Sequence, residues 1–113
     1  DSGDTALIIA SVGELEIVKE LLEHPRIDVN LQDENGHTSL ILAASHGELD
    51  IVKELLKHEN IDVNLQDEDG DTALSIAKRK NNEEIVNLIT LYKARKSRTT
   101  SNLEEGKRKK RKG

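Results

Sequence analysis

The chain has 113 residues, with one Tyr, no Cys, Met, Phe or Trp, and a net charge of −5 from 17 basic and 22 acidic residues. The absence of cysteine excludes a disulfide framework and cysteine-ligated zinc, and no apolar run in the sequence reaches membrane-spanning length. Because aromatic residues are almost absent, Leu, Ile, Val and Ala must fill the interior, which favours thin layers of stacked helices over one thick core.

Charge divides the chain into two parts. Residues 1–92 hold 7 Lys and Arg against 20 Asp and Glu, a net −13, while residues 93–113 hold 10 against 2, a net +8. A separation of this size predicts an acidic folded body followed by a basic tail. The lack of cysteine fits a reducing compartment, so we expect the protein in the cytoplasm, the nucleus or both.

An internal repeat organises the acidic body. The segment GELEIVKELLEHPRIDVNLQDENG, residues 13–36, recurs with few changes as GELDIVKELLKHENIDVNLQDEDG, residues 47–70. A third, more divergent copy starts at Asp67, and the first copy is one residue shorter before its Gly13. A period in the low thirties is typical of a solenoid. We therefore expect repeats at about 1–32, 33–66 and 67–92, then a basic, flexible tail at 93–113 whose first residues can continue a helix to Lys96.

The second copy shows the elements of one repeat in order. A turn at 33–37 contains Asn-Gly, and Thr38 then precedes a short apolar helix that Gly47 ends. A second helix at about 49–56 has one apolar face, and residues 61–65 alternate between apolar and polar. The unit is predicted to be a helix, a tight turn, a helix and an extended hairpin.

The two ends of the stack differ in polarity. The third copy has the polar residues Lys78, Asn81, Asn82 and Glu84 where the second has Ala44, Gly47, Glu48 and Asp50. The loss of apolar packing positions, clearest at Lys78, predicts a water-facing cap. In the first copy, Ile8, Ile9 and Val12 lie where a preceding repeat could cover them. We expect further repeats before Asp1.

These residues resemble the ankyrin repeat over about residues 1–92. The G-x-T-x-L-x-x-A opening, the G-E-L-x-I-V-K-x-L-L helix and the D-V-N close recur in the order typical of that family. The family's Thr-Pro-Leu-His stands here as Thr38-Ser39-Leu40-Ile41, without its Pro and His. The resemblance implies an all-α ankyrin-repeat solenoid of helix-turn-helix units with projecting β-hairpin loops.

No pattern in the sequence indicates catalysis. There is no cysteine nucleophile, no Gly-rich phosphate loop and no H-E-x-x-H motif. His24 and His58 occupy the same repeat position, so duplication explains them better than metal binding does. The acidic tract around Asp67 lacks the twelve-residue loop of a calcium site, so we expect it to be a solvent-exposed hairpin tip. We expect no enzymatic activity, no cofactor and no metal.

The resemblance instead implies a protein-binding scaffold or adaptor that contacts another protein through its hairpin tips and first helices. The corresponding residues on the tips are Asp4, Glu34, Asn35, His37, Glu68, Asp69 and Asp71, and those near the first helices are Val12, Ser45, His46, Arg79 and Lys80. The acidic tips favour a partner with a basic surface. The alternative is that these acids only keep a monomeric repeat protein soluble.

The basic tail has several possible roles. Arg95 and Lys96, followed ten residues later by Lys107, Arg108, Lys109, Lys110, Arg111 and Lys112, resemble a bipartite nuclear localisation signal. Contact with RNA or DNA phosphates, anionic lipid or the acidic repeats would also explain the charge. A nucleic-acid-associated adaptor is therefore the alternative function. No aromatic residues accompany the basic run, which disfavours sequence-specific reading of single strands.

Two asparagines follow Asp-Val in equivalent positions. Asn30 and Asn64 lie eight residues after Leu22 and Leu56, a pattern similar to that of ankyrin repeats hydroxylated by an asparaginyl hydroxylase. The simpler interpretation is that each Asn ties down the hairpin backbone.

Overall fold

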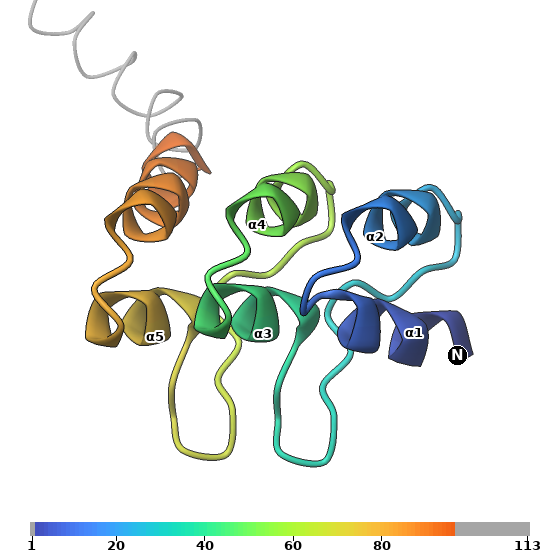
Figure 1. The fold of residues 1–113 in the computed structure, drawn as a ribbon, viewed down its shortest axis with the longest axis horizontal. Coiled ribbons are helices and arrows are strands. Elements are labelled where there is room, and N and C mark those ends of the chain that lie inside the picture. The colour runs from blue at the N-terminus through green and yellow to red at the C-terminus, as the bar shows by residue number, and fades with distance from the viewer. Residues whose placement is uncertain (1, 97–113) are drawn as a thin grey trace, which may run out of the picture.

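The computed structural model describes residues 2–96, with side chains from residue 5 onward. Its helices are α1 (Ser2–Ala10), α2 (Leu15–Leu22), α3 (Ser39–Ser45), α4 (Leu49–Leu56) and α5 (Ala73–Arg79), followed by an unlabelled helix at 83–96. Figure 1 shows α1, α3 and α5 in one layer and α2, α4 and helix 83–96 in a second. Within these layers α3 contacts α1 and α5, and α2 contacts α4. Successive helix pairs thus stack as a solenoid.

Two loops project from the layer of α1, α3 and α5 (Figure 1). They turn at residues 33–37 and 67–71, and no residue between 2 and 96 is assigned to a strand. Each turn is closed by paired backbone groups: Asp33 N–H donates to the His37 carbonyl, and Asp67 N–H donates to the Asp71 carbonyl, both at 2.9 Å. The predicted all-α solenoid with projecting hairpins is confirmed, although the hairpins are loops and not β-ladders.

The predicted helix boundaries of the second copy are confirmed. Thr38 is the N-cap of α3 and its hydroxyl accepts a hydrogen bond from the Ile41 N–H, while Gly47 follows the helix at φ 70°. In the third copy Asn81 takes the place of Gly47 at φ 61°, a conformation that Asn tolerates better than most residues. The first copy differs, because α1 begins at Ser2 and Thr5 therefore lies inside the helix.

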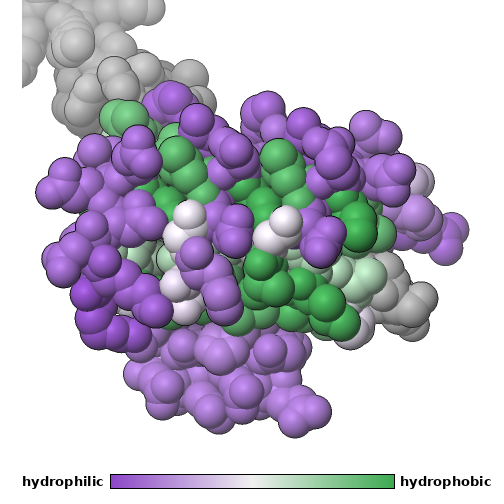
Figure 2. All heavy atoms as spheres, viewed as in Figure 1, coloured by the Kyte–Doolittle hydropathy of each residue, from purple (hydrophilic) through white to green (hydrophobic). Residues whose placement is uncertain are grey.

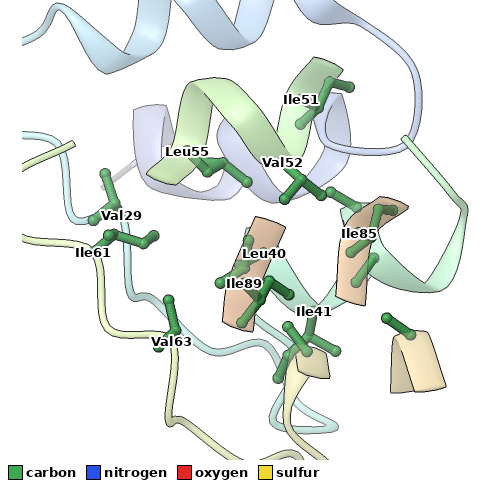
Figure 3. Close-up of a cluster of buried hydrophobic side chains, with 14 of the residues drawn as sticks. Val29, Leu40, Ile41, Ile51, Val52, Leu55, Ile61, Val63, Ile85 and Ile89 are labelled. Carbon is green, nitrogen blue, oxygen red and sulfur yellow. The ribbon is translucent and has the colours of Figure 1, made fainter. Parts of the chain in front are cut away.

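One apolar cluster runs through all three repeats, and Figure 3 shows its central part. Leu40 and Ile41 of α3 meet side chains of α4 and of helix 83–96, among them Leu55 and Ile89, and each of these four is at most 1% exposed. Val29, Ile61 and Val63 close the cluster from the loops. Ile61 and Val63 are buried while Asp62 and Asn64 between and after them are exposed, as the alternation predicts.

The same helix position changes its burial along the stack. Ile17 of α2 is 44% exposed, whereas its equivalents Ile51 of α4 and Ile85 of the last helix are 1% and 0% exposed. A preceding helix pair covers the second and third of these side chains. In the first repeat Ile9 and Val12 are also exposed, but Ile8, expected on the same open face, is buried.

The last repeat turns polar groups toward solvent. Lys78, Asn81 and Glu84 are exposed, whereas Ala44, the equivalent of Lys78, is fully buried. Asn82 is half-buried, and its side-chain oxygen accepts a hydrogen bond from the Ile85 N–H at 3.3 Å. Helix 83–96 continues past residue 92 to Lys96, so residues 93–96, expected at the start of the tail, are helical. Between residues 2 and 96, no helix has the length and apolarity that a membrane crossing needs.

Candidate functional site

Each hairpin turn is built around one aspartate. Asp33 Oδ1 accepts hydrogen bonds from the N–H groups of Asn35 and His37, each at 2.9 Å. Asp67 Oδ1 accepts the equivalent pair from Asp69 and Asp71, also at 2.9 Å. A carboxylate that accepts two backbone N–H groups fixes the turn locally. Asp67, which the sequence suggested as part of an exposed acidic tract, is buried and serves this structural role.

A ladder of hydrogen bonds joins the first hairpin to the second. Asn30 Nδ2 donates to the Asn60 carbonyl, and Asn30 Oδ1 accepts from the Asp62 N–H, both at 2.8 Å. Gln32 Nε2 donates to the Gln66 carbonyl at 2.8 Å as well as to its own Gly36 carbonyl at 2.9 Å. Near the tip, the Glu68 N–H donates to the Asn35 carbonyl at 2.9 Å. Asn30 thus ties down hairpin backbone, although the backbone belongs to the neighbouring repeat.

His37 lies between two carboxylates. Its Nδ1 is 3.7 Å from Asp33 Oδ2 and its Nε2 is 3.5 Å from Asp67 Oδ2. The imidazole therefore bridges the first and second hairpins, and a protonated ring would pair with both acids. His37 was predicted to contact a partner, but both ring nitrogens already face groups of the protein itself.

Asp71 and Arg79 neutralise each other at the base of the second hairpin. Arg79 Nη1 donates to Asp71 Oδ1 at 3.1 Å, and the Ser75 hydroxyl donates to the same oxygen at 3.1 Å. The hydrogen bond from Arg79 is the main reason that the pKa of Asp71 lies below its usual value, and Ser75 lowers it further. Ser75 also completes a capping box with Thr72 at the start of α5.

The remaining predicted contact residues are open to solvent or partly so. Glu34, Asn35, Glu68 and Asp69 are exposed at the two hairpin tips, His46, Lys80 and Val12 are exposed at the ends of α3, α5 and α1, and Ser45 is half-buried. In Figure 2 the hairpin tips form a hydrophilic lobe below a band that contains apolar side chains. The side chain of Asp4 lies outside the described residues.

The tail prediction is only partly within the described chain. Arg95 and Lys96 are exposed at the end of helix 83–96, and the Lys96 amine lies 5.7 Å from the centre of the Tyr92 ring. Lys107, Arg108, Lys109, Lys110, Arg111 and Lys112 lie outside the described residues. The hydroxylation of Asn30 or Asn64 stays a prediction, which the intact mass of protein from its native cell would test.

Sequence reasoning predicted that Asn30 ties down hairpin backbone, but it missed the roles of Gln32 and Asp33 and the fact that Asn30 binds the neighbouring repeat. Asn30, Gln32 and Asp33 act on the neighbouring backbone or on their own turn, and all three recur unchanged 34 positions later as Asn64, Gln66 and Asp67. The fact that these polar residues are identical in the two hairpins was the signal in the sequence that pointed to their structural role. Among the described residues, no group of three or more His, Asp or Glu side chains could hold a metal ion.

The stacked helix pairs and projecting hairpins agree with a comparison against known families. A family model for ankyrin repeats, in three copies, matches residues 7–100. None of the curated proteins matches the chain. The matched region covers most of the chain and all of the helix pairs beyond the first turn of α1. The chain therefore belongs to the ankyrin-repeat family, whose repeats generally mediate protein–protein interaction.

Proposed function

We propose that this protein is a scaffold that binds a protein partner across its hairpin tips and the exposed ends of α1, α3 and α5. The observation that carries the proposal is the charge of the tips. Glu34, Glu68 and Asp69 are exposed there, and their carboxylates have no ion pair among residues 5–96, whereas Asp33, Asp67 and Asp71 are used within the fold. The available acids are therefore fewer than the sequence suggested.

A partner with a basic surface fits these tips best. Exposed charges of one sign accelerate encounter with the opposite sign and contribute less as salt screens them. The exposed apolar side chains of Ile9 and Val12 on α1 and after it could add buried area at one end of the same layer. The contact would combine charge at the tips with apolar contact beside the helices.

The test compares two triple variants with the same change in net charge. Glu34→Gln, Glu68→Gln and Asp69→Asn remove the tip charges, while Glu20→Gln, Glu23→Gln and Glu59→Gln remove exposed charges from the region of the outer helices. Each chain is used to purify partners, and the affinity of the recovered protein is then measured at two salt concentrations. We expect only the tip variant to bind about tenfold more weakly and to lose its salt dependence. Equal affinities for the two variants would reject the acidic-tip interface.

For the basic tail we propose a nuclear-targeting role. The proposal is supported by the run from Lys107 to Lys112 and by the exposed Arg95-Lys96 pair ten residues before it. In cells, a tagged chain with residues 107–112 changed to Gln should have a lower nuclear fraction than a control with Lys53, Lys57 and Lys78 changed to Gln. If the nuclear fraction of the 107–112 variant were unchanged, the proposed nuclear-targeting role would be contradicted. If the same tail variant instead loses salt-dependent binding to RNA or DNA, the tail contacts phosphates.

A further inference from the structure

The second hairpin, residues 60–71, has an edge that repeats the groups with which the first hairpin holds its neighbour. On the first hairpin these groups are the Asn30 side-chain amide, the Gln32 Nε2 and the Asn35 carbonyl, which pair with the backbone of residues 60, 62, 66 and 68. The second hairpin carries Asn64, Gln66 and Asp69 at the equivalent positions. We refer to these three residues as the terminal edge.

The terminal edge has no neighbouring hairpin within residues 2–96 (Figure 1). Gln66 Nε2 donates to its own Gly70 carbonyl at 3.0 Å, as Gln32 does to Gly36, but among residues 5–96 it has no counterpart of the hydrogen bond from Gln32 to the next hairpin. In the described part of the chain, the Asn64 side chain makes no hydrogen bond, and only its backbone N–H is paired, with Asp62 Oδ1 at 2.9 Å. The terminal edge therefore offers both donors and acceptors.

The reason lies in the length of helix 83–96. The equivalent helices α2 and α4 end at Leu22 and Leu56, and the chain then leaves the helix in a loop. The loop after α4 supplies the Asn60 carbonyl and the Asp62 N–H that Asn30 binds. The equivalent residues of the third repeat, 94 and 96, are still helical, so no loop within residues 2–96 comes back to Asn64.

An open groove of about 570 Å³ lies where that loop would lie. One wall is formed by residues 61–64, which include Ile61, Val63 and Asn64, and the other by Tyr92, Lys93 and Lys96 of helix 83–96. The groove therefore combines apolar side chains, one side-chain amide and positive charge. These are the features of a site that holds extended peptide backbone and selects its side chains.

We propose that the terminal edge and this groove bind an extended segment of a partner protein by pairing with its backbone. The occupant is inferred from the equivalent edge, where Asn30 and Gln32 bind backbone groups of residues 60, 62 and 66 in a loop that contains no helix. Asn64 would bind a carbonyl and the N–H two residues later, and Gln66 would bind a carbonyl further along. Lys93 favours an acidic side chain at the groove, and Glu68 and Asp69 favour basic side chains near the tip.

The chain itself supplies the probe for a test. A synthetic peptide with the sequence of residues 58–68, but with Lys in place of the last two acids, has the backbone that Asn30 binds and the charge that the tip attracts. It is titrated into the full-length, ¹⁵N-labelled protein while the side-chain amide signals are followed by NMR. We expect saturable shifts at Asn64 and Gln66 and none at Asn30 and Gln32, whose amides are already paired.

Two changes separate backbone recognition from general attraction. Changing Asn64→Ala and Gln66→Ala together should weaken peptide binding about tenfold, while the control Asn87→Ala, at an exposed position on helix 83–96, should leave it unchanged. A peptide N-methylated at the position of Asp62 lacks the N–H that Asn64 would accept. This peptide should also bind about tenfold more weakly to the unmodified protein.

Several outcomes would overturn the proposal. The first is the absence of shifts at Asn64 and Gln66 at millimolar peptide, and the second is equal binding of the N-methylated peptide. If neutralising residues 107–112 in the full chain moves these two signals without peptide, the occupant is the protein's own tail. If the signals move with protein concentration alone, the occupant is a second copy of the chain. Unchanged signals in both of these controls support a partner segment.

Discussion

Gly36 lies directly against the backbone of Asp67: a Cβ atom added to Gly36 would come within 2.9 Å of the Asp67 Cα. The first hairpin tip thus approaches the second so closely that a side chain has no room. Gly36 also has a φ of 81°, which favours glycine for a second reason. The equivalent Gly70 has a φ of 83° and nothing within 4 Å of an added Cβ. The two glycines have the same backbone conformation and differ in their neighbours.

Changing Gly36→Ala should therefore destabilise the protein more than Gly70→Ala does. Both variants place alanine in the left-handed region, which costs about 1–2 kcal/mol. Only Gly36→Ala adds a backbone clash, for which we expect about 1–3 kcal/mol more. Urea unfolding of both variants measures the difference in the free energy of unfolding. If both variants lost the same free energy of unfolding, the two hairpins would be able to move apart at Gly36 without destabilising the protein.

Asn30 should contribute to stability and Asn64 should not. Asn30→Ala removes two hydrogen bonds to the next repeat and leaves the Asn60 carbonyl and Asp62 N–H without that partner, a loss of about 1–3 kcal/mol in the free energy of unfolding. Asn64→Ala should change it by less than about 0.5 kcal/mol, because its side chain makes no hydrogen bond within residues 5–96. Thermal or urea unfolding checks both. If Asn64→Ala lowered the free energy of unfolding strongly, the Asn64 side chain would have to bind another part of this same chain.

Ile17 and Ile51 occupy the same helix position in successive repeats, but their contributions to the free energy of unfolding should differ. Ile51→Ala removes a fully buried side chain and should lower the free energy of unfolding by about 2–5 kcal/mol. Ile17→Ala removes one that is 44% exposed and should cost about 1 kcal/mol. The surrounding helix sequences LEIVKELL and LDIVKELL are nearly identical, so helix propensity cancels from the comparison. Similar losses from urea unfolding would mean that Ile17 is covered in solution.

Asp71 should make stability fall in acid. Its pKa is lowered in the folded protein, chiefly by the hydrogen bond from Arg79, so the folded state binds the proton more weakly than the unfolded state does. The resulting stabilisation is present above the ordinary aspartate pKa and is lost as the pH falls through the lowered folded value. We expect Asp71→Asn to flatten this part of the stability profile, measured from urea midpoints across the acidic range.

Arg79→Gln provides the matching control for the acid experiment. It removes the main cause of the lowered pKa while Asp71 and its hydrogen bond from Ser75 remain. The profile of Arg79→Gln should therefore lie between those of the unmodified protein and Asp71→Asn. Three parallel profiles would show that this pair does not couple stability to pH.

The sequence predicts the repeat architecture because each local signal agrees with the 34-residue period. Thr38 caps a helix, Gly47 ends it, and the apolar face that follows in α4 is buried, as expected. The start of α1 was not predictable in this way, since Thr5 lies within the helix and does not cap it. Local patterns thus identify the helix starts of the second and third repeats, where Thr38 and Thr72 are N-caps, but not that of the first.

The binding surface was harder to predict, because it depends on contacts between residues about thirty positions apart. His37 looks like an exposed tip residue in the sequence, but its ring lies beside Asp67 of the next hairpin. Asp71 looks like a free acid, yet Arg79 and Ser75 use it. Both facts depend on how the hairpins stack on one another, and this packing cannot be deduced from composition or residue spacing.

Asn30 and Asn64 are equivalent, as are Gln32 and Gln66, so each of the first two hairpins presents the same side chains to a following repeat. In a duplicate of residues 33–66 inserted after Gln66, the backbone of the new hairpin would meet Asn64 and Gln66, which are already in place, and its own copies of these two residues would form the new terminal edge. The stack could then lengthen by one helix pair without any redesign, and the polar third repeat would still close it. Growth of this kind requires only a tandem duplication, which makes the number of repeats the easiest property of this protein to change.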